Sequence, residues 1–388
     1  MYDVVISGAG PSGSRCAEIL AKAGFNIALI ERDTKWRKPC GGALNHWVLD
    51  TYPKLRKLGL PVIKGTILHS ADYHELDFIG DERSWGTVMD RLDLDNFIRD
   101  FAIDAGAHLF DKNLSVDFLY KNHRKIGVKT KSPSGIQEYQ GKIIILADGM
   151  SSKLAIRSGL RMKWNIREIA NAKCAIMIGD HHLDEKMIYI YFRPYKGYAW
   201  IFPLEGKKFN IGVYTFAEDN FNCNINELYH EFFTNPNIKK LLPLSTYEVI
   251  WSGAYPFPTE GIKEKGLYDD NLMLIGDTGG FVSPISGEGI QHALLSGQIS
   301  AEVAIKALES EDYSKNMLKQ YKGHPKIKNT ARIFKTKLAM RDFFYTNRGE
   351  KLNKIFELTQ GDPEFKKDVV DVFMSKTIPS KEFLSKIQ

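Results

Sequence analysis

The chain has 388 residues, of which 43% are apolar and 26% charged, and it carries a net charge of +6 at neutral pH. This length is enough for two closely joined domains with large cores, and the composition is that of a globular protein. No run of eighteen apolar residues occurs, so no membrane-spanning segment is predicted. The start, Met1-Tyr2-Asp3, leads directly into an apolar run, which is not typical of a signal peptide.

Cysteine spacing and charge distribution narrow the range of sites and partners. Cys16, Cys40, Cys174 and Cys223 form no CxxC pair, so we expect no metal site, no disulfide framework and a cytoplasmic location. Residues 311–388 hold seventeen Lys/Arg against ten Asp/Glu. This basic region favours either peripheral contact with anionic lipid on the inner membrane face or a solvated helical face. No aromatic-interleaved basic stripe accompanies the charge, so nucleic acid is not an expected partner.

The N-terminus has a strand–turn–helix pattern that is typical of dinucleotide binding. An apolar strand over 2–6 enters a Gly-x-Gly-x-x-Gly turn, a helix over 14–23 follows, and a second strand over 26–30 ends next to an acid. The first glycine allows the tight turn, the second lets the backbone approach a pyrophosphate, and the third lets helix and strand pack closely. The helix N-terminus would face the phosphates, and the acid would accept from ribose hydroxyls. The predicted binding residues are Gly8, Gly10, Pro11, Ser12, Gly13, Glu31 and Arg32.

Hydrophobic periodicity predicts the remaining elements. In the first half we expect an irregular loop and a helix over 36–62, strands over 65–69 and 75–79, a helix over 93–105, and strands over 108–110, 115–120, 125–130 and 142–146. In the second half we expect aromatic-rich strands over 172–178, 188–192, 198–203 and 209–216, a helix over 225–234, a strand over 271–275, a helix over 287–308 and a basic helical region.

Three further segments predict contacts to the same cofactor. Asp277 and Gly276 follow a buried strand, and Gly287, Gly289 and Ile290 open a long helix whose positive end would stabilise an anionic reduced flavin. Arg91 begins a helix, where it would bridge to the pyrophosphate or the ribityl chain. Asp148 lies in an Ala-Asp-Gly turn after a strand and is expected to brace that turn beside the cofactor.

Together these motifs resemble the flavoproteins of the p-hydroxybenzoate hydroxylase and reductase type, which implies FAD. The implied fold is α/β with an α+β insert: a Rossmann-type FAD-binding domain, an inserted antiparallel-sheet substrate domain and a C-terminal helical region. No second Gly-x-Gly-x-x-Gly turn exists. The electron donor, NAD(P)H or a ferredoxin acting as redox partner, would therefore bind briefly in the same cleft or dock from outside.

We expect six segments in this arrangement. The FAD-binding domain is predicted over 1–62, 89–161 and 258–310, the substrate sheet over 63–88 and 162–257, and the helical region over 311–388.

Two segments resemble the geranylgeranyl reductase family: Lys38-Pro39-Cys40-Gly41-Gly42-Ala43 and the stretch from Pro194 to Pro203 with Tyr198-x-Trp200-x-Phe202-Pro203 at its centre. The run from Ala147 to Leu160 is similar to that family as well, and the resemblance covers roughly residues 1–310. The family saturates isolated double bonds of C20 isoprenoid chains, in archaeal ether lipids or on the chlorophyll side chain. Carried over by position, the resemblance implies FAD contacts at Gly13, Glu31, Cys40, Gly41, Ala43, Arg91, Asp277, Gly289 and Ile290, with Ser115 near the adenine. Gly42, in the same segment as Cys40, is also a predicted cofactor-binding residue.

The chain departs from the family pattern at three places. Pro194 lies four residues before Tyr198 where three are usual, and Leu94 replaces the usual Phe. The expected Gly-x-Gly reads Gly212-Val213-Tyr214, so the Tyr214 side chain would narrow a lipid tunnel.

Tyr198, Trp200 and Phe202 alternate along one strand and therefore point to one face. That face would form either an apolar slot for a polyprenyl chain or an ordinary aromatic core. In the first case, each buried CH₂ would contribute roughly 0.8 kcal/mol.

The expected reaction is hydride transfer from reduced flavin to one alkene carbon, with protonation of the other by Cys40, Tyr198 or a water. An alternative for Cys40 is a packing role. Two other functions stay open. A flavin-dependent monooxygenase or halogenase usually reads Trp-x-Trp-x-Ile-Pro where this chain has Tyr198 and Phe202. A flavoprotein passing electrons to a quinone would yield no reduced C=C product.

Overall fold

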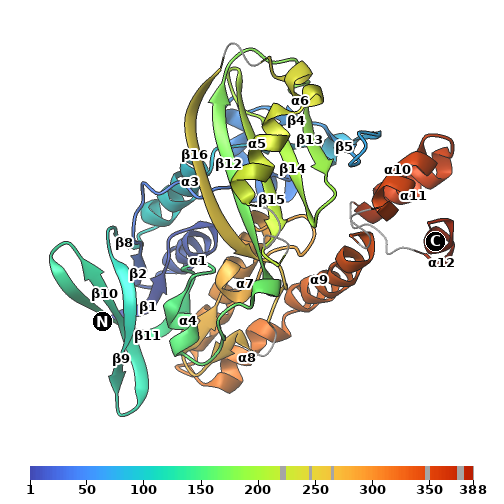
Figure 1. Cartoon of the computed structure of the whole chain (residues 1–388). Helices are drawn as coiled ribbons and strands as arrows, with labels where there is room; N and C mark the ends of the chain where they lie inside the picture. The colour runs from blue at the N-terminus through green and yellow to red at the C-terminus, as the bar shows by residue number, and fades with distance from the viewer. Residues whose placement is uncertain (219–223, 244–246, 264–265, 346–349, 374–379, 388) are drawn as a thin grey trace. The chain divides into compact units, whose positions relative to one another are not determined.

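The computed structural model describes residues 1–218, 224–243, 247–263, 266–345, 350–373 and 380–387. Cys223 lies outside the described residues. The chain divides into two compact units, of which unit 1 comprises residues 1–37, 92–168 and 257–335, and unit 2 comprises residues 38–91, 169–256 and 336–388. Both units combine segments that are distant in sequence (Figure 1). The functional domain boundaries given above remain a prediction.

Unit 1 is built on a largely parallel sheet with the strand order β17-β18-β11-β1-β2-β8. Its strands are β1 (Tyr2–Ser7), β2 (Ile27–Ile30), β8 (His108–Phe110), β9 (Leu114–Lys121), β10 (Arg124–Ser132), β11 (Gly135–Leu146), β17 (Tyr268–Asp269) and β18 (Leu272–Leu274). Its helices are α1 (Pro11–Lys22), α3 (Arg91–Asp104, from its second residue), α4 (Lys153–Arg157), η3 (Ile166–Glu168), η6 (Gly276–Gly279), α7 (Ile290–Glu309), α8 (Lys315–Gly323) and the first part of α9 (Pro325–Phe344).

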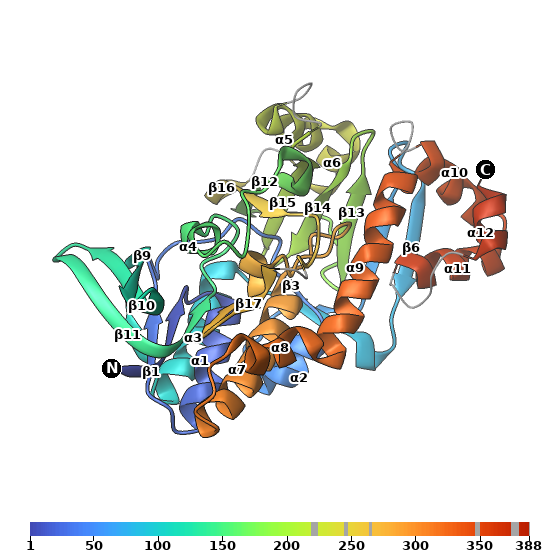
Figure 2. The same ribbon diagram turned by 90° about the horizontal axis from the view of Figure 1, so that it is seen from below.

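The central strands of unit 1 are apolar on both sides because helices cover them. β1 and β2 carry continuous buried runs such as Val4-Val5-Ile6, as expected for parallel strands. Helices α1 and α7 cross where Gly297 faces Ser12: a Cβ built on Gly297 would lie 2.3 Å from the Ser12 carbonyl oxygen. α8 lies beside α7 (Figure 2) and adds Leu318 and Tyr321 to the same core.

Unit 2 is built on a seven-stranded sheet with the order β16-β12-β15-β14-β13-β5-β6. Its strands are β5 (Gly65–His69), β6 (Glu75–Ile79), β12 (Ile169–Ile178), β13 (Met187–Phe192), β14 (Gly197–Pro203), β15 (Lys208–Phe216) and β16 (Glu248–Pro258), and a small second sheet contains β3 (Ala43–Leu44), β4 (Val62–Ile63) and β7 (Gly86–Val88). Its helices are α2 (His46–Thr51), η1 (Pro53–Lys57), η2 (Glu82–Ser84), α5 (Ile225–Thr234), α6 (Pro236–Leu241), the second part of α9, α10 (Glu350–Thr359), α11 (Pro363–Phe373) and α12 (Lys381–Lys386).

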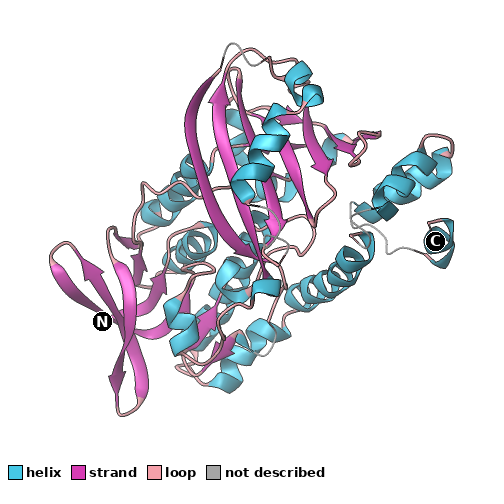
Figure 3. Ribbon diagram, in the orientation of Figure 1, coloured by secondary structure: helices cyan, strands magenta, loops and turns pink. Residues whose placement is uncertain are grey.

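One face of this sheet is covered by α5 and α6. Tyr189, Ile201 and Ile211 point to this face and form a core with Leu228 and Phe232 of α5. Figure 3 shows α5 lying across the strands. Since alternate residues of a strand point to opposite faces, Tyr198, Trp200 and Phe202 lie on the other face, away from α5 and α6.

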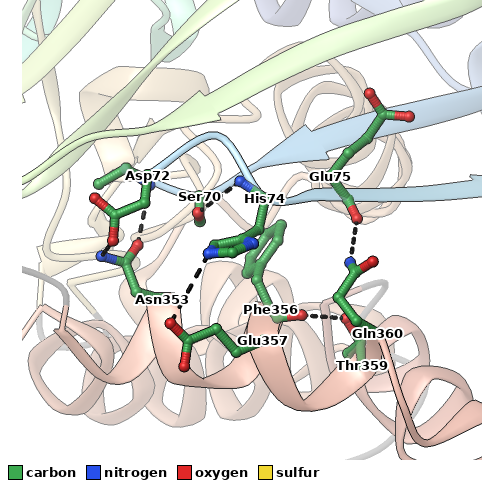
Figure 4. Close-up of polar contacts among 10 residues, drawn as sticks. Ser70, Asp72, His74, Glu75, Asn353, Phe356, Glu357, Thr359 and Gln360 are labelled. Atoms are coloured by element: carbon green, nitrogen blue, oxygen red, sulfur yellow. Dashed lines mark hydrogen bonds and ion pairs between the residues drawn. The ribbon is translucent and has the colours of Figure 1, made fainter.

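The C-terminal helices pack on the β5–β6 end of that other face. Phe356 of α10 contacts Phe192, with ring centroids 6.0 Å apart, inside a cluster that also contains Leu68 and Leu76. Polar contacts also join α10 to the β5–β6 turn (Figure 4). The side chain of Asn353 accepts from Ala71 N at 3.1 Å and donates to Asp72 at 2.6 Å. The basic C-terminal region is therefore not one body, because α8 belongs to unit 1 and α10 to α12 belong to unit 2.

The predicted fold class is confirmed, with two differences in detail. In the large sheet the pair β13–β5 is parallel, whereas the pairs β12–β15, β13–β14, β14–β15 and β5–β6 are antiparallel. β11 begins at Gly135 rather than at Lys142, because its first half pairs with the hairpin strand β10 and its second half with β1.

Candidate functional site

The glycine turn after β1 is shaped by backbone contacts within unit 1. Gly8 has φ +103°, and a Cβ there would lie 2.4 Å from the carbonyl oxygen of Ala147. A Cβ on Gly13 would lie 1.9 Å from the carbonyl oxygen of Gly8. Both positions therefore require glycine for packing, as predicted for the first and third glycines of the turn.

Gly10 differs from these two glycines because no atom lies within 4 Å of a Cβ built on it. It is the N-cap residue of α1, and it provides no side chain to cap the first-turn N–H groups. The first turn also lacks an acidic residue. The start of α1 therefore combines unpaired backbone N–H donors, the positive end of the helix dipole and open space beside Gly10. This arrangement is suited to binding an anion.

Glu31 lies at the carboxyl end of β2, next to this turn. Its carboxylate accepts from Ala9 N at 2.8 Å and from Asp33 N at 3.0 Å. Ser115 lies close to the same edge, since its hydroxyl accepts from Ser7 at 2.7 Å. The neighbouring Arg32 guanidinium lies over the ring of Trp36 at 4.6 Å.

The second glycine-rich segment meets the first one inside unit 1. A Cβ on Gly276 would lie 2.5 Å from the Ser12 hydroxyl. Asp277 faces the start of α7, because its Oδ1 lies 3.6 Å from a Cβ built on Gly289. Gly289 is the N-cap of α7 and provides no side-chain cap, so a second helix N-terminus opens here. Gly287 precedes it with φ +65°, against the ring of Phe257.

Asp148 joins the same region from the end of β11. The Thr278 hydroxyl donates to the adjacent Gly149 carbonyl at 3.0 Å, which links the two segments. Among the described residues, the Asp148 Oδ1 atom is enclosed without a hydrogen-bond partner. Burial raises the pKa of this carboxyl to about 6, and the charge of Glu31 acts in the same direction. Unit 1 thus holds the Asp148 carboxyl, one oxygen of which has no hydrogen-bond partner among the described residues, where the glycine-rich segments meet.

The Cys40–Ala43 segment belongs to unit 2 and lies on the aromatic strand. A Cβ on Gly41 would lie 2.4 Å from Cε2 of Phe202, and one on Gly42, which has φ +79°, would lie 2.1 Å from the Met89 carbonyl oxygen. Ala43 pairs with Val88 across the small sheet. Arg91, at the start of α3, is buried. The structure thus groups the predicted site residues into two sets, one in each unit.

The aromatic residues are in register across β14 and β15. Trp200 stands opposite Gly212, and a Cβ on Gly212 would lie 2.2 Å from the indole ring, so the indole covers this glycine. Tyr198 stands opposite Tyr214, and their rings meet edge to face at 4.6 Å. Burial raises the pKa of Tyr214 well above its ordinary value. Trp200, Phe202 and Tyr214 are all buried.

The sequence did not single out Asn210, which is buried beside these residues. Its side chain joins the Trp200 indole to the Cys40 carbonyl. Cys16 and Cys174 are buried, and burial raises the pKa of each thiol to about 12. Within the described ranges, no group of three or more His, Cys, Asp and Glu residues is placed to hold a metal ion.

The parallel sheet, the glycine turn and the uncapped starts of α1 and α7 in unit 1 form an arrangement typical of dinucleotide-binding proteins. No family model matches the sequence. The chain is 30% identical over 366 residues to digeranylgeranylglycerophospholipid reductase 1 of Methanosphaera stadtmanae, covering 92% of this chain and 88% of the relative. It is 31% identical over 341 residues to the digeranylgeranylglycerophospholipid reductase of Methanocaldococcus jannaschii, which covers 85% of this chain and 83% of that relative. The chain belongs to the digeranylgeranylglycerophospholipid reductase family.

Solved structures share the whole fold. A geranylgeranyl bacteriochlorophyll reductase-like protein of Thermoplasma acidophilum superposes with a TM-score of 0.82 at 24% identity, covering 96% of this chain and 99% of that one. A flavin-dependent brominase superposes with a TM-score of 0.74 at 19% identity, covering 97% and 100%. The predicted membership of the reductase family is confirmed by the sequence relatives.

We predict opposite effects for two glycine substitutions in the α1 turn. Gly13→Ala forces a Cβ into the Gly8 carbonyl and should lower the melting temperature of the flavin-free protein by several degrees, equivalent to about 2 kcal/mol or more. Gly10→Ala meets no protein atom and should leave that melting temperature within about 2 °C, while weakening FAD binding at least tenfold. Calorimetry and fluorescence titration with FAD measure both effects. Equal loss of stability in both variants would contradict the assignment.

We also predict a pH-dependent gain in stability from Asp148→Asn. The folded pKa of about 6 lies above the ordinary value of 3.8, so the cost of ionising this carboxyl in the folded protein is absent well below pH 4, grows between pH 4 and pH 6 and is fully present above that. In the flavin-free protein the stability difference between variant and parent should therefore grow from pH 4 to about pH 6 and then stay constant, with a total change of at most about 3 kcal/mol. Denaturant titrations at four pH values measure it, and a difference that is constant with pH would contradict the raised pKa.

Proposed function

We propose that the protein reduces isolated C=C bonds in the geranylgeranyl chains of archaeal-type membrane ether lipids, with FAD as cofactor. The observation that carries this proposal is similarity over 85–92% of the chain to relatives named digeranylgeranylglycerophospholipid reductase. The activity belongs to those relatives by name, and the chain retains the residues on which the family resemblance rests, including Cys40-Gly41-Gly42 and Tyr198-x-Trp200-x-Phe202.

The residues of unit 1 fit a dinucleotide such as FAD. Gly10 has open space around it, and the starts of α1 and α7 have no side-chain cap. These N–H groups would bind the pyrophosphate, and the carboxylates of Glu31 and Asp277 would accept from the ribose and ribityl hydroxyls. When bound, FAD would supply a hydride to one alkene carbon. An external donor, NAD(P)H or a ferredoxin, would provide the electrons.

The other residues would act by orientation and by exclusion of water. Tyr198, Trp200 and Phe202 present an apolar row on one face of β14, and the matching row on β15 contains Gly212 and Tyr214. Such a row would bind a polyprenyl chain through burial, at roughly 0.8 kcal/mol per CH₂. No carbonyl polarises an isolated alkene, so positioning is the main source of catalysis. Cys40, Tyr198 or a water would protonate the second carbon.

A second candidate function is oxygen chemistry, because the flavin-dependent brominase shares the fold. That likeness lies at 19% identity and extends to the fold alone. The chain reads Tyr198-x-Trp200-x-Phe202-Pro203 where we expect Trp-x-Trp-x-Ile-Pro in a halogenase. We therefore favour reduction.

We further propose that a basic face of unit 1 contacts the membrane that contains the substrate. Residues 315–341 hold nine Lys/Arg and no Asp/Glu. The other 361 residues hold 44 Lys/Arg and 47 Asp/Glu. Within the described parts of the chain, no helix has both the length and the apolarity needed to span a bilayer. Six of the nine cations are exposed on α8 and the first part of α9, and we call them the α8–α9 basic face: Lys315, Lys319, Lys326, Lys328, Arg332 and Lys335.

This face suits electrostatic attachment rather than insertion. Lys328, Arg332 and Lys335 recur at helical spacing and are exposed, whereas Ile327 and Phe334 of the same helix are buried. The segment 315–345 contributes no exposed large apolar side chain. Each cation near an anionic bilayer contributes about 1 kcal/mol, and the attraction falls with salt.

The test of the reaction is anaerobic. Purified protein is loaded with FAD, reduced with dithionite and mixed with a digeranylgeranylglycerophospholipid in detergent. We expect reoxidation of the flavin and a gain of two hydrogens for each double bond, seen by mass spectrometry. A flavin that stays reduced with an unchanged lipid would contradict the reductase function. Rapid NAD(P)H oxidation in air driven by an aromatic substrate would instead support oxygen chemistry.

The test of the basic face is vesicle binding. The triple variant Lys319→Glu, Lys326→Glu and Lys328→Glu should bind phosphatidylglycerol vesicles at least tenfold more weakly than the parent in 0.1 M salt, because three attractive charges become repulsive. Sedimentation with vesicles measures this binding.

A matched control carries the same charge change elsewhere on unit 1: Lys121→Glu, Lys131→Glu and Lys163→Glu, all at exposed positions. Its affinity for the phosphatidylglycerol vesicles should fall by no more than about threefold. Equal loss in both triple variants would mean that net charge, and not the α8–α9 basic face, determines binding.

A further inference from the structure

Asn210 lies at the centre of a buried polar link within unit 2. It is 3% exposed and stands opposite Phe202 on the face of β15 that also carries Gly212. Its Oδ1 accepts from the Trp200 indole N–H at 2.8 Å, and its Nδ2 donates to the Cys40 carbonyl at 2.9 Å. Cys40 is 170 residues away in sequence, so the link ties the Cys40 segment to the sheet.

The two partners of Asn210 determine which way its amide points. An indole N–H only donates and a carbonyl only accepts, so the oxygen must face Trp200 and the nitrogen must face Cys40. A carboxylate at this position would satisfy the indole but repel the carbonyl, and an apolar side chain would leave both groups unpaired. Leaving buried polar groups without partners is costly, so this site requires an amide.

The neighbouring contacts make this link decisive for the Cys40 segment. Gly41 rests on the ring of Phe202, and Gly42 approaches the Met89 carbonyl. Met89 N also donates to Gly42 O at 3.0 Å. The Cys174 thiol lies 4.0 Å from the Cys40 carbonyl, at the limit of a weak hydrogen bond. Residues 41–43 are therefore positioned by packing and backbone pairing, whereas the stronger of the two contacts to the Cys40 carbonyl comes from Asn210.

We propose that Asn210 is a positioning residue that, together with the Trp200 indole, fixes the Cys40 peptide on the aromatic strand and thereby sets the direction of the Cys40 thiol. Trp200 and Cys40 are both residues of the proposed reaction. The link makes their relative position depend on the Asn210 side chain. Its role in turnover rests on the proposed function, but its structural effect does not.

The test measures reaction of the Cys40 thiol with 4,4′-dithiodipyridine, which reacts in acid as well as in base. The protein carries its flavin and the change Cys223→Ser, and the labelled peptide is identified by mass spectrometry. Cys16 and Cys174 are buried, so Cys40 should dominate the labelling. Asn210→Leu removes both hydrogen bonds and should raise the Cys40 labelling rate at least fivefold at every pH.

Asn210→Asp distinguishes a hydrogen bond from simple packing. At pH 8 the introduced carboxylate repels the Cys40 carbonyl, and labelling should rise at least fivefold relative to the parent protein. Burial beside a carbonyl raises the pKa of the introduced carboxyl. At pH 5.5 its protonated form donates to Cys40 and accepts from Trp200, so the ratio of rates should fall to about twofold or less. A ratio that does not change with pH would overturn the proposal.

Two matched variants complete the design. Asn171→Asp makes the same chemical change on β12, at a residue whose neighbours Ala170 and Ala172 are the ones facing the aromatic side. It should leave the labelling rate at the parent value, and an equal increase there would overturn the proposal. Trp200→Phe removes the indole donor together with part of the ring that covers Gly212, but leaves the Asn210 amide able to donate to the Cys40 carbonyl. It should give a rate between those of the parent and Asn210→Leu. A Cys40 labelling rate equal to that of the parent protein would mean that the Trp200 indole does not help to fix the Cys40 peptide.

The activity assay in detergent separates this proposal from the proposed function. If the parent protein reduces the lipid, Asn210→Asp should lower kcat at least fivefold at pH 8, with recovery towards pH 5.5 and little change in KM. If the parent is inactive, the proposed function fails while the labelling result still decides the role of Asn210. If Asn210→Leu does not fold, the pH dependence in Asn210→Asp decides alone.

Discussion

The contact between the Gly13 position on α1 and the Gly8 carbonyl at the end of β1 is the constraint on which unit 1 depends. A Cβ at Gly13 would lie 1.9 Å from that oxygen, so helix and turn meet backbone to backbone. This approach brings the N-terminus of α1 to the carboxyl edge of the sheet, where parallel α/β folds bind their ligands. It also brings Ser12 within reach of Gly276 and Gly297, so that the second glycine-rich segment and α7 come to the same point. One close contact thus unites segments almost 300 residues apart.

Unit 2 holds the aromatic side chains of β14 in a defined orientation. One face of its large sheet is closed by α5 and α6, and the β5–β6 end of the other face is covered by the C-terminal helices. Between them, Trp200 covers Gly212, and the Cys40 segment lies against Phe202. Tyr214 packs edge to face on Tyr198. The apolar row therefore consists of residues that hold one another in register.

The sequence predicted those features whose signals are local. The apolar run of β1, the glycine turn and the periodic apolar residues of α3 and α7 each determine their own element, and the structure contains them. β11 was predicted too short, because the mixed stretch Ile136-Gln137-Glu138 forms a strand only through pairing with β10. Asn210 could not be found, since an isolated asparagine in an aromatic strand has no local signature and its partner lies 170 residues away. Similarly, the division of the basic C-terminal region between two units depends on tertiary packing.

The central claim is that a dinucleotide held at Gly10 serves reduction of a geranylgeranyl lipid. The most direct measurement is mass spectrometry of ether lipids from a bacterial host that makes digeranylgeranylglycerophospholipids and expresses this chain together with a suitable electron donor. The account predicts lipid species heavier by two hydrogens for each reduced double bond, and their absence when the chain carries Gly10→Ala. Fully unsaturated lipids in cells whose purified protein is loaded with FAD would contradict it.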